Sequence, residues 1–322
     1  MPAPAQHRII FDTDPGVDDA MALLLALRSP EIEVIGLTTV FGNSTVDVTT
    51  RNALNLLALA GRKDIPVARG AGCPLVMPLG GTGEWVHGDD AMGNVGWHAQ
   101  LDPAQRPVDQ HAAEFIVEQV MAHPGEITLV PVAPLTNLAL ALRLEPRVAR
   151  NVREVVMMGG AALSPGNVSP LAEANIYGDP HAADIVFAAE WPIVMAGLDL
   201  TESMHADNRI WHLLRDSGDP FGVFLAGAVG FYQSFHATWY GLDNGATYMH
   251  DPCTIAYLID PTLFEGEDWA ITVPVEGPAK GATIVDRRGK FYKTPKVHCL
   301  LKGDEAGLLR LFQQRLAKIP PQ

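Results

Sequence analysis

The chain has 322 residues, enough for one large α/β domain or two small ones, and 48% of them are apolar, which is enough for a sizeable core. Its 23 Lys and Arg against 37 Asp and Glu give a formal charge of −14. Such a chain is a poor non-specific binder of nucleic acid, whose phosphates need clustered basic side chains. The three cysteines form no CxxC pair and are expected to be reduced, mostly buried thiols of a cytoplasmic protein. No signal region and no run of about 18 apolar residues is found, so neither secretion nor membrane spanning is indicated.

Apolar, β-branched runs alternate with helical patterns through the first two-thirds of the chain. The predicted strands are Arg8–Phe11, Ile32–Thr39, Ile65–Ala68, Ile127–Val132, Val152–Met158 and Ile193–Ala196. The predicted helices are Asp18–Arg28, Val46–Ala60, Gln110–Ala122, Pro134–Arg143 and Pro180–Ala189. This alternation predicts an α/β fold with an open, mostly parallel (mixed) sheet, helices on both faces and a Rossmann-like active site at the C-terminal strand ends. No linker interrupts the pattern, so residues 1–322 are expected to form a single domain.

Two long irregular segments break this alternation, at residues 69–108 and 159–178. Each of them follows a predicted strand. Long loops inside a compact domain are usually functional or disordered, and ligands of open α/β sheets bind beyond the carboxyl ends of the strands. We therefore expect both loops to reach the active-site edge.

The stretch "FDTDPGVDDA", residues 11–20, places four aspartates directly after the first strand: Asp12, Asp14, Asp18 and Asp19. A Pro-Gly turn leads out of the strand, so the last two fall in the first helical turn, where the helix dipole favours ionised carboxylates. Four like charges need solvent, shared protons or a cation to compensate them. HExxH and CxxC are both absent, which argues against zinc. Calcium or magnesium fits better, because both prefer oxygen ligands.

Polar groups at other predicted strand ends offer further donors. "VAPLTN" (132–137) offers Thr136 and its backbone carbonyl, and "MHDPC" (249–253) offers Asp251 beside His250. A His-Asp-Pro at a helix start can also be only an N-cap. The loop "PGNVSPLAEANIYGDP" contributes donors and acceptors that suit the hydroxyls of a sugar, unless they only solvate the loop. These side chains are Asn167, Glu173 and Asn175.

The motifs "DTDPGVDDA", "AEANIYGDP" and "HDPC" resemble those of the nucleoside hydrolase family, which includes inosine–uridine-preferring and pyrimidine-preferring ribohydrolases. "VFGN" (40–43), "RNAL" (51–54), "APLTNLA" (133–139) and "MMGG" (157–160) also fit, in the family's order, from about residue 8 to 260. The resemblance implies hydrolysis of the N-glycosidic bond of ribonucleosides to ribose and free base, by a calcium-oriented water that an aspartate activates. It further implies a homodimer or homotetramer acting on small-molecule nucleosides.

The resemblance also implies roles for individual residues. The calcium ligands are Asp14, Asp19, Asp251 and the Thr136 carbonyl, with Asp12 behind them, and Asp18 is the base. The residues implied to contact the sugar are Asn43, Met158, Asn167, Glu173 and Asn175. His250 and His87 lie near the leaving base as candidate catalytic groups, and Tyr232, His236 and Tyr240 are candidate base contacts.

Three departures from the family pattern leave the preferred base open. Ala174 stands where some purine-accepting members carry an aromatic ring. Ala91 and Met92 depart from the form HG-x-D-G-L-G, and the segment before His250 is longer than usual.

Two other readings compete with this one. "IIFDTD" and "GDPHAAD" (178–184) resemble the acidic motifs of haloacid-dehalogenase phosphatases, in which Asp12 is the nucleophile, Asp14 the acid and magnesium the metal. That reading leaves Asp18 and Asp19 unexplained. A non-catalytic calcium-dependent ribose binder is the second alternative, and an intact Asp18 argues against it.

Overall fold

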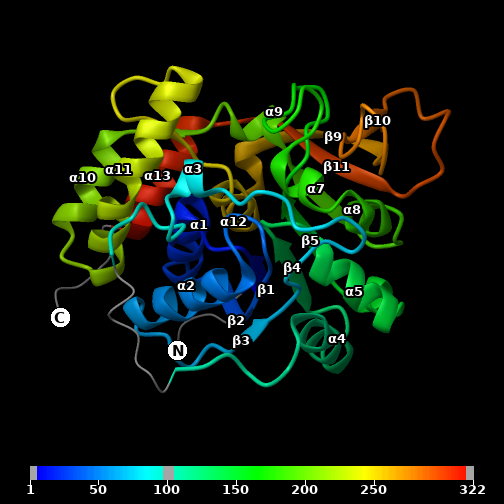
Figure 1. Cartoon of the computed structure of the whole chain (residues 1–322), viewed down its shortest axis with the longest axis horizontal. Coiled ribbons are helices and arrows are strands. Elements are labelled where there is room, and N and C mark those ends of the chain that lie inside the picture. Colours follow the sequence, from blue (N-terminus) through cyan, green and yellow to red (C-terminus); the bar gives the residue numbers. More distant parts are fainter. Residues whose placement is uncertain (1–5, 97–104, 317–322) are drawn as a thin grey trace.

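The computed structural model describes residues 6–96 and 105–316, and its centre is a nine-stranded sheet with the order β10-β9-β11-β6-β5-β4-β1-β2-β3 (Figure 1). The strands are β1 (His7–Thr13), β2 (Ile32–Thr39), β3 (Val67–Arg69), β4 (Ile127–Pro131), β5 (Glu154–Met158), β6 (Ile193–Ala196), β9 (Phe264–Thr272), β10 (Ile284–Asp286) and β11 (Lys296–Gly303). Every ladder of this sheet is parallel except the two that β9 makes with β10 and β11. The predicted mostly parallel, mixed α/β sheet is therefore confirmed.

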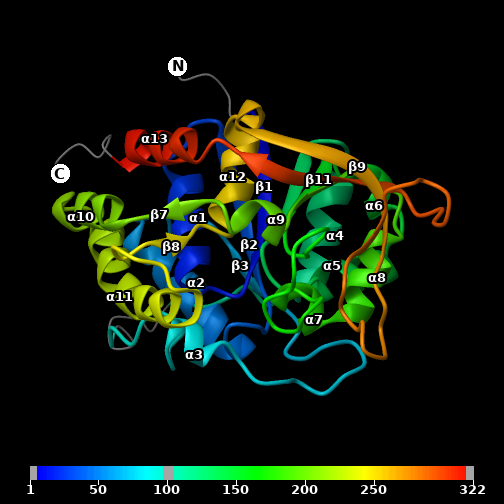
Figure 2. The same ribbon diagram turned by 90° about the horizontal axis from the view of Figure 1, so that it is seen from above.

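Helices cover both faces of the sheet, and the core forms one large apolar cluster on each side. Figure 2 shows the two groups of helices on opposite sides of β1. One group is α1 (Val17–Leu27), α2 (Val46–Leu59), α10 (Asn208–Asp216), α11 (Pro220–Tyr240), α12 (Pro252–Ile259) and α13 (Glu305–Leu316); the other is α4 (Ala112–Ala122), α5 (Thr136–Leu144), α6 (Val148–Asn151) and α8 (Pro180–Phe187). The short elements are α3 (Glu84–His87), α7 (Ala174–Gly178), α9 (Leu198–Thr201), β7 (His205–Ala206), β8 (Thr247–Tyr248) and the 3₁₀ turn Pro261–Leu263.

Most predicted elements form, with shifted boundaries. The third strand runs from Val67 to Arg69 rather than from Ile65 to Ala68, because Pro66 has no N–H for a sheet ladder. Beyond residue 196 no element was predicted, and there the structure adds α9 to α13 and the strands β7 to β11. Of the predicted loop 69–108, residues 97–104 lie outside the described part of the chain, as do residues 1–5.

The three cysteines are unpaired, and two of them, Cys253 and Cys299, are buried, as predicted. Within the described ranges, no helix is long and apolar enough to cross a membrane.

The central strands bring the polar motifs to one edge of the sheet. β1 and β4 pair in parallel and end at Thr13 and Pro131, and β5 and β6 end beside them at Met158 and Ala196. Strand β4 is buried over its whole length, which is typical of a parallel strand covered on both faces. The groups that could do chemistry therefore come from rigid, buried strand ends.

Candidate active site

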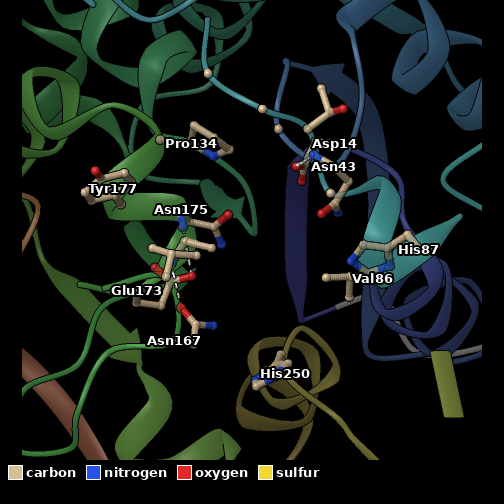
Figure 3. A pocket seen from close by; sticks show the side chains of 18 of the residues that line it. Asp14, Asn43, Val86, His87, Pro134, Asn167, Glu173, Asn175, Tyr177 and His250 are labelled. Carbon is tan, nitrogen blue, oxygen red and sulfur yellow. Dashed lines mark hydrogen bonds between the residues drawn. The ribbon is translucent and has the colours of Figure 1, made fainter. Parts of the chain in front are cut away.

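A cavity of about 510 Å³ lies at this edge. Figure 3 shows Asn167, Glu173 and Asn175 on one wall, and Asn43 and His87 on the wall that faces it. Both long loops contribute lining residues, Met77 to Gly83 from the first and Asn167 to Gly178 from the second. The prediction that the two loops reach this edge is confirmed for their described parts.

The acidic cluster of the cavity combines two segments that are far apart in sequence. Asp18, Asp19 and Asp251 each bring one carboxylate oxygen within 4.8 Å of the other two. The first two lie in the opening turn of α1, and Asp251 directly precedes α12. Asp14 is not one of that trio but lines the same cavity, where its Oδ2 accepts a hydrogen bond of 2.6 Å from the backbone N–H of Asn43.

Burial makes the charged form of these carboxyls costly. It raises the pKa of Asp18 to about 6, and burial together with the Asp18 charge raises the pKa of Asp19 to about 6. Burial and the neighbouring carboxylates hold the pKa of Asp14 and of Asp251 well above the usual range. Protons or a cation must therefore balance the cluster. Oδ1 of Asp14 and Oδ1 of Asp18 are both buried without a hydrogen-bond partner among the described residues.

Asp12 lies behind the cluster, as the resemblance implies. Its Oδ1 accepts hydrogen bonds from the Thr38 hydroxyl (2.5 Å) and from Asn137 Nδ2 (2.8 Å). Burial raises its pKa to about 7, although both hydrogen bonds oppose the shift. Asp12 is therefore held in place by protein donors.

Thr136, a predicted ligand, does not line the cavity. It is buried, and its hydroxyl donates to Asp179 (2.8 Å). It is also the first residue of α5, so its carbonyl points along the helix axis towards the N–H of the residue four positions later. Val132, at the end of β4, lines the cavity instead, and its carbonyl accepts from Asn175 Nδ2 at 3.2 Å. The "VAPLTN" segment therefore reaches the cavity through Val132 rather than through Thr136.

The wall opposite α3 presents fixed polar groups. Glu173 caps α7 and accepts three backbone N–H groups at 2.8, 2.8 and 3.2 Å, while burial raises its pKa. Asn175 Nδ2 donates to the carbonyls of Val132 and Met158, which leaves its oxygen available to a ligand. Asn167 is held by a backbone N–H on its oxygen (3.0 Å), which leaves its amide nitrogen available. Such a set matches the hydroxyls of a sugar.

His87 faces Asp18 from the loop side. Its Nδ1 accepts from the backbone N–H of Val17 (3.2 Å), so the ring proton sits on Nε2, which lies 4.0 Å from Asp18 Oδ1. Burial lowers the His87 pKa to about 4. At neutral pH this histidine is a neutral hydrogen-bond donor rather than a cation.

Two further histidines are also neutral. His236 Nδ1 lies 2.8 Å from the Tyr232 carbonyl, and its Nε2 has no partner in the described chain. His250 Nδ1 lies 2.8 Å from the Thr201 hydroxyl. Burial lowers the pKa of His236 to about 4 and that of His250 to about 3. Tyr240 packs on His236 with ring centroids 5.7 Å apart, so all five predicted base-side residues, Tyr232 included, line one cavity.

An aromatic group on α11 adds contacts that were not assigned from the sequence. The Tyr232 hydroxyl donates to Asp18 Oδ2 (3.2 Å), and its ring stacks on His87 with centroids 5.2 Å apart. At the rim, Trp85 packs edge-on against Phe235 and remains 52% exposed. The only signal in the sequence is the density of aromatic residues before His250.

Replacing Tyr232 by phenylalanine is expected to lower kcat about tenfold, with little change in KM, on the nucleosides that the motif resemblance implies as substrates. The loss of one hydrogen bond to a carboxylate corresponds to about 1.5 kcal/mol, and the ring stacking on His87 is retained. Steady-state kinetics checks this, with Tyr257→Phe on α12, which does not line the cavity, as the matched control. An unchanged kcat would show that the hydroxyl does not support Asp18.

The phosphatase reading does not survive this geometry. Asp184 of "GDPHAAD" is exposed on α8 and outside the cavity, and Asp179 caps that helix through the N–H of Ala182 (3.0 Å). No second acidic motif of that kind reaches Asp12 and Asp14 in the described chain.

Comparison with known proteins decides the family. The sequence pattern of the inosine-uridine preferring nucleoside hydrolases matches residues 9–310. The chain belongs to this family. Membership makes it a hydrolase of small-molecule nucleosides, as the resemblance of its motifs implies, and it argues independently against the phosphatase reading.

Individual relatives cover almost the whole chain. It is 40% identical to a probable uridine nucleosidase 2 of Arabidopsis thaliana, over 97% of this chain and 98% of the relative. Its structure is similar to a plant nucleoside hydrolase (TM-score 0.92, 38% identity, 98% and 100% covered) and to a purine-preferring ribonucleoside hydrolase from Gardnerella vaginalis (TM-score 0.90, 33% identity, 96% and 98% covered). Because these names differ in the base, likeness alone does not assign the base preference.

Proposed function

We propose that this protein uses water to cleave the N-glycosidic bond of ribonucleosides, releasing ribose and the free base. The observation that carries the proposal is the cavity itself. Buried aspartates from the turn after β1, from α1 and from the start of α12 face the fixed polar groups of Glu173 and Asn175 across a space of about 510 Å³. A ribose fits between an acidic wall and a hydrogen-bonding wall, with the base directed at the aromatic and histidine side.

The donor set fits calcium. It consists of carboxylate and carbonyl oxygens, and Asp14 Oδ1 and Asp18 Oδ1 are buried without protein partners among the described residues. We infer that Asp14, Asp19 and Asp251 hold the ion, with the Val132 carbonyl as a backbone donor in place of that of Thr136. Bound there, calcium offsets carboxylate charge, orients sugar hydroxyls and makes water more acidic.

The protein's own groups account for proton transfer and charge stabilisation. Asp18 accepts the proton of the attacking water through Oδ1, while Tyr232 holds its other oxygen. Cleavage builds positive charge on the sugar ring, and the surrounding carboxylates, including Glu173, stabilise that charge in a poorly hydrated site. Asn43, which donates to Asp19 through Nδ2 (3.1 Å), keeps that carboxylate in position.

The leaving base meets hydrogen-bonding groups rather than a strong acid. His87 presents Nε2–H, and we assign His250 to the same side, so both stabilise negative charge that develops on the base. His236, Tyr240 and the rim aromatics contact its flat faces. Met158 and Asn167 complete the sugar contacts on the far wall.

The remaining features of the proposal concern the whole protein. We infer one catalytic domain over residues 1–322 and a cytoplasmic homodimer or homotetramer that serves nucleoside salvage. Light scattering of the purified protein tests the oligomeric state.

The first test is the identity of the products. With uridine or inosine as substrate, free ribose and base are expected at the same rate with and without inorganic phosphate, because the reaction consumes only water. Sugar analysis by chromatography checks this. Ribose 1-phosphate that forms only when phosphate is added would contradict hydrolysis. Nucleoside binding without any product would instead favour a calcium-dependent ribose binder.

A further inference from the structure

The short helix α9, between β6 and β7, reaches the active site from behind through two side chains. Thr201 is fully buried, and its hydroxyl oxygen lies 2.8 Å from Nδ1 of His250. Asp199, two residues earlier, accepts the backbone N–H groups of residues 162–164 at 2.7, 2.7 and 2.9 Å. One helical turn therefore contacts both the base-side histidine and the loop that carries the sugar-side residues.

Either Thr201 or His250 can be the donor of their hydrogen bond. The two arrangements differ in whether they leave a buried polar group without a partner. If the Thr201 hydroxyl donates to Nδ1, both groups are paired and the ring proton lies on Nε2. If Nδ1–H donates instead, the hydroxyl proton of the fully buried Thr201 has no acceptor, since this contact is the only side-chain hydrogen bond of Thr201 in the described part of the chain. Burying a hydrogen-bond donor without an acceptor is unfavourable, so the first arrangement is favoured.

We propose that Thr201 is a positioning residue that holds His250 as the Nε2–H tautomer, with its protonated nitrogen available to the departing base. The inference rests on the proposed function for the place of the base, but the tautomer itself does not depend on it. Thr201 does not line the cavity, whereas His250 does. Its effect on the reaction therefore passes through the imidazole.

This role predicts a dependence on the leaving group. A departing uracil or hypoxanthine carries negative charge on ring nitrogen and carbonyl oxygen, which a correctly placed N–H donor stabilises. A good leaving group such as 4-nitrophenolate needs no such donor. Loss of the Thr201 hydroxyl should therefore slow nucleosides while sparing an aryl riboside.

Asp199, on the same helix as Thr201, is expected to affect the reaction in a different way. Its carboxylate orders residues 162–164, and the same loop continues to Asn167 and Glu173. Disturbing it should weaken sugar binding and raise KM for uridine and for the aryl riboside alike. The two side chains thus separate leaving-group stabilisation from sugar binding.

The experiment compares Thr201→Val, Thr201→Ser, Asp199→Asn and the buried control Thr128→Val on β4, each with uridine and with 4-nitrophenyl riboside. Thr201→Val is expected to lower kcat on uridine about tenfold and to leave the aryl riboside within about twofold, which is the pattern of His250→Ala in milder form. Thr201→Ser, which keeps the hydroxyl, should recover most of the uridine rate. Thr201→Val affecting both substrates equally, or neither, overturns the proposal.

Nitrogen-15 spectra of labelled histidine side chains in the wild-type protein decide the tautomer without any variant. A protonated Nε2 on His250 supports the inference, and a protonated Nδ1 overturns it, even if Thr201→Val fails to fold. Wild-type protein that releases no ribose from either uridine or inosine would contradict the proposed function instead, while the tautomer result would still stand.

Discussion

Replacement of Asp18 by asparagine is expected to lower kcat on uridine by about 10²–10⁴-fold, the usual effect of losing a general base. The variant keeps the size of the side chain and a hydrogen-bond acceptor for Tyr232, but it cannot take a proton from water. Calcium content should change far less, because Asp14, Asp19 and Asp251 remain.

Asp251→Asn is the informative partner of this variant. It should weaken calcium and sugar binding together, raising KM as well as lowering kcat. Asp216→Asn, at an exposed surface pair with Arg215, serves as the control for a lost carboxylate. If Asp18→Asn turns uridine over at nearly the wild-type rate, water is activated elsewhere. If the variant loses calcium as well, Asp18 is a ligand, as its place in the trio with Asp19 and Asp251 would then explain.

Removal of calcium is expected to lower activity by at least about 10²-fold, since a catalytic cation supplies several kcal/mol of charge stabilisation. It should also destabilise the protein in a pH-dependent way. Asp18 and Asp19, with pKa values raised to about 6, and Asp12, raised to about 7, hold protons in the metal-free folded state that the unfolded chain releases near pH 4. The free energy of unfolding of the metal-free protein therefore falls as pH rises from about 4 to 7.

Calcium reverses this loss, because its ligands bind it after releasing their protons. The calcium-induced rise in Tm should be larger at pH 8 than at pH 5, by about 5 °C or more at about 2 °C per kcal/mol. The lowered pKa values of His87 and His250 also reduce the free energy of unfolding as pH falls towards about 4. This contribution is present with and without metal, so it cancels in the calcium-induced change in Tm. Calorimetry with and without chelator measures this change in Tm at each pH. A calcium-induced rise in Tm that is constant or shrinks with rising pH would contradict the assignment of these aspartates as calcium ligands.

The part of the site that the sequence predicts is local. Asp14, Asp18 and Asp19 follow one buried strand and share one turn, so their proximity needs no knowledge of the rest of the fold. Asp251 was placed by resemblance of "HDPC", and the packing of α1 and α12 in one core cluster brings it to them.

The parts that were missed depend on contacts between distant segments. Tyr232 reaches Asp18 across 214 positions, because α11 packs beside α1. Whether Val132 or Thr136 reaches the cavity depends on where α5 begins. The short segment between these two residues does not define that start. The edge strand β10 and its neighbour β9 were missed because they are antiparallel additions whose burial pattern is irregular.

A calcium titration followed by uridine turnover on the same sample shows whether hydrolysis depends on a bound calcium ion. The metal-free protein is loaded stepwise, bound calcium is measured per chain, and ribose release is assayed at each step. Binding is expected to saturate at about one calcium per chain, and the hydrolysis rate is expected to rise in proportion to calcium occupancy. Full activity without calcium, or a bound ion that leaves uridine intact, would contradict this expectation.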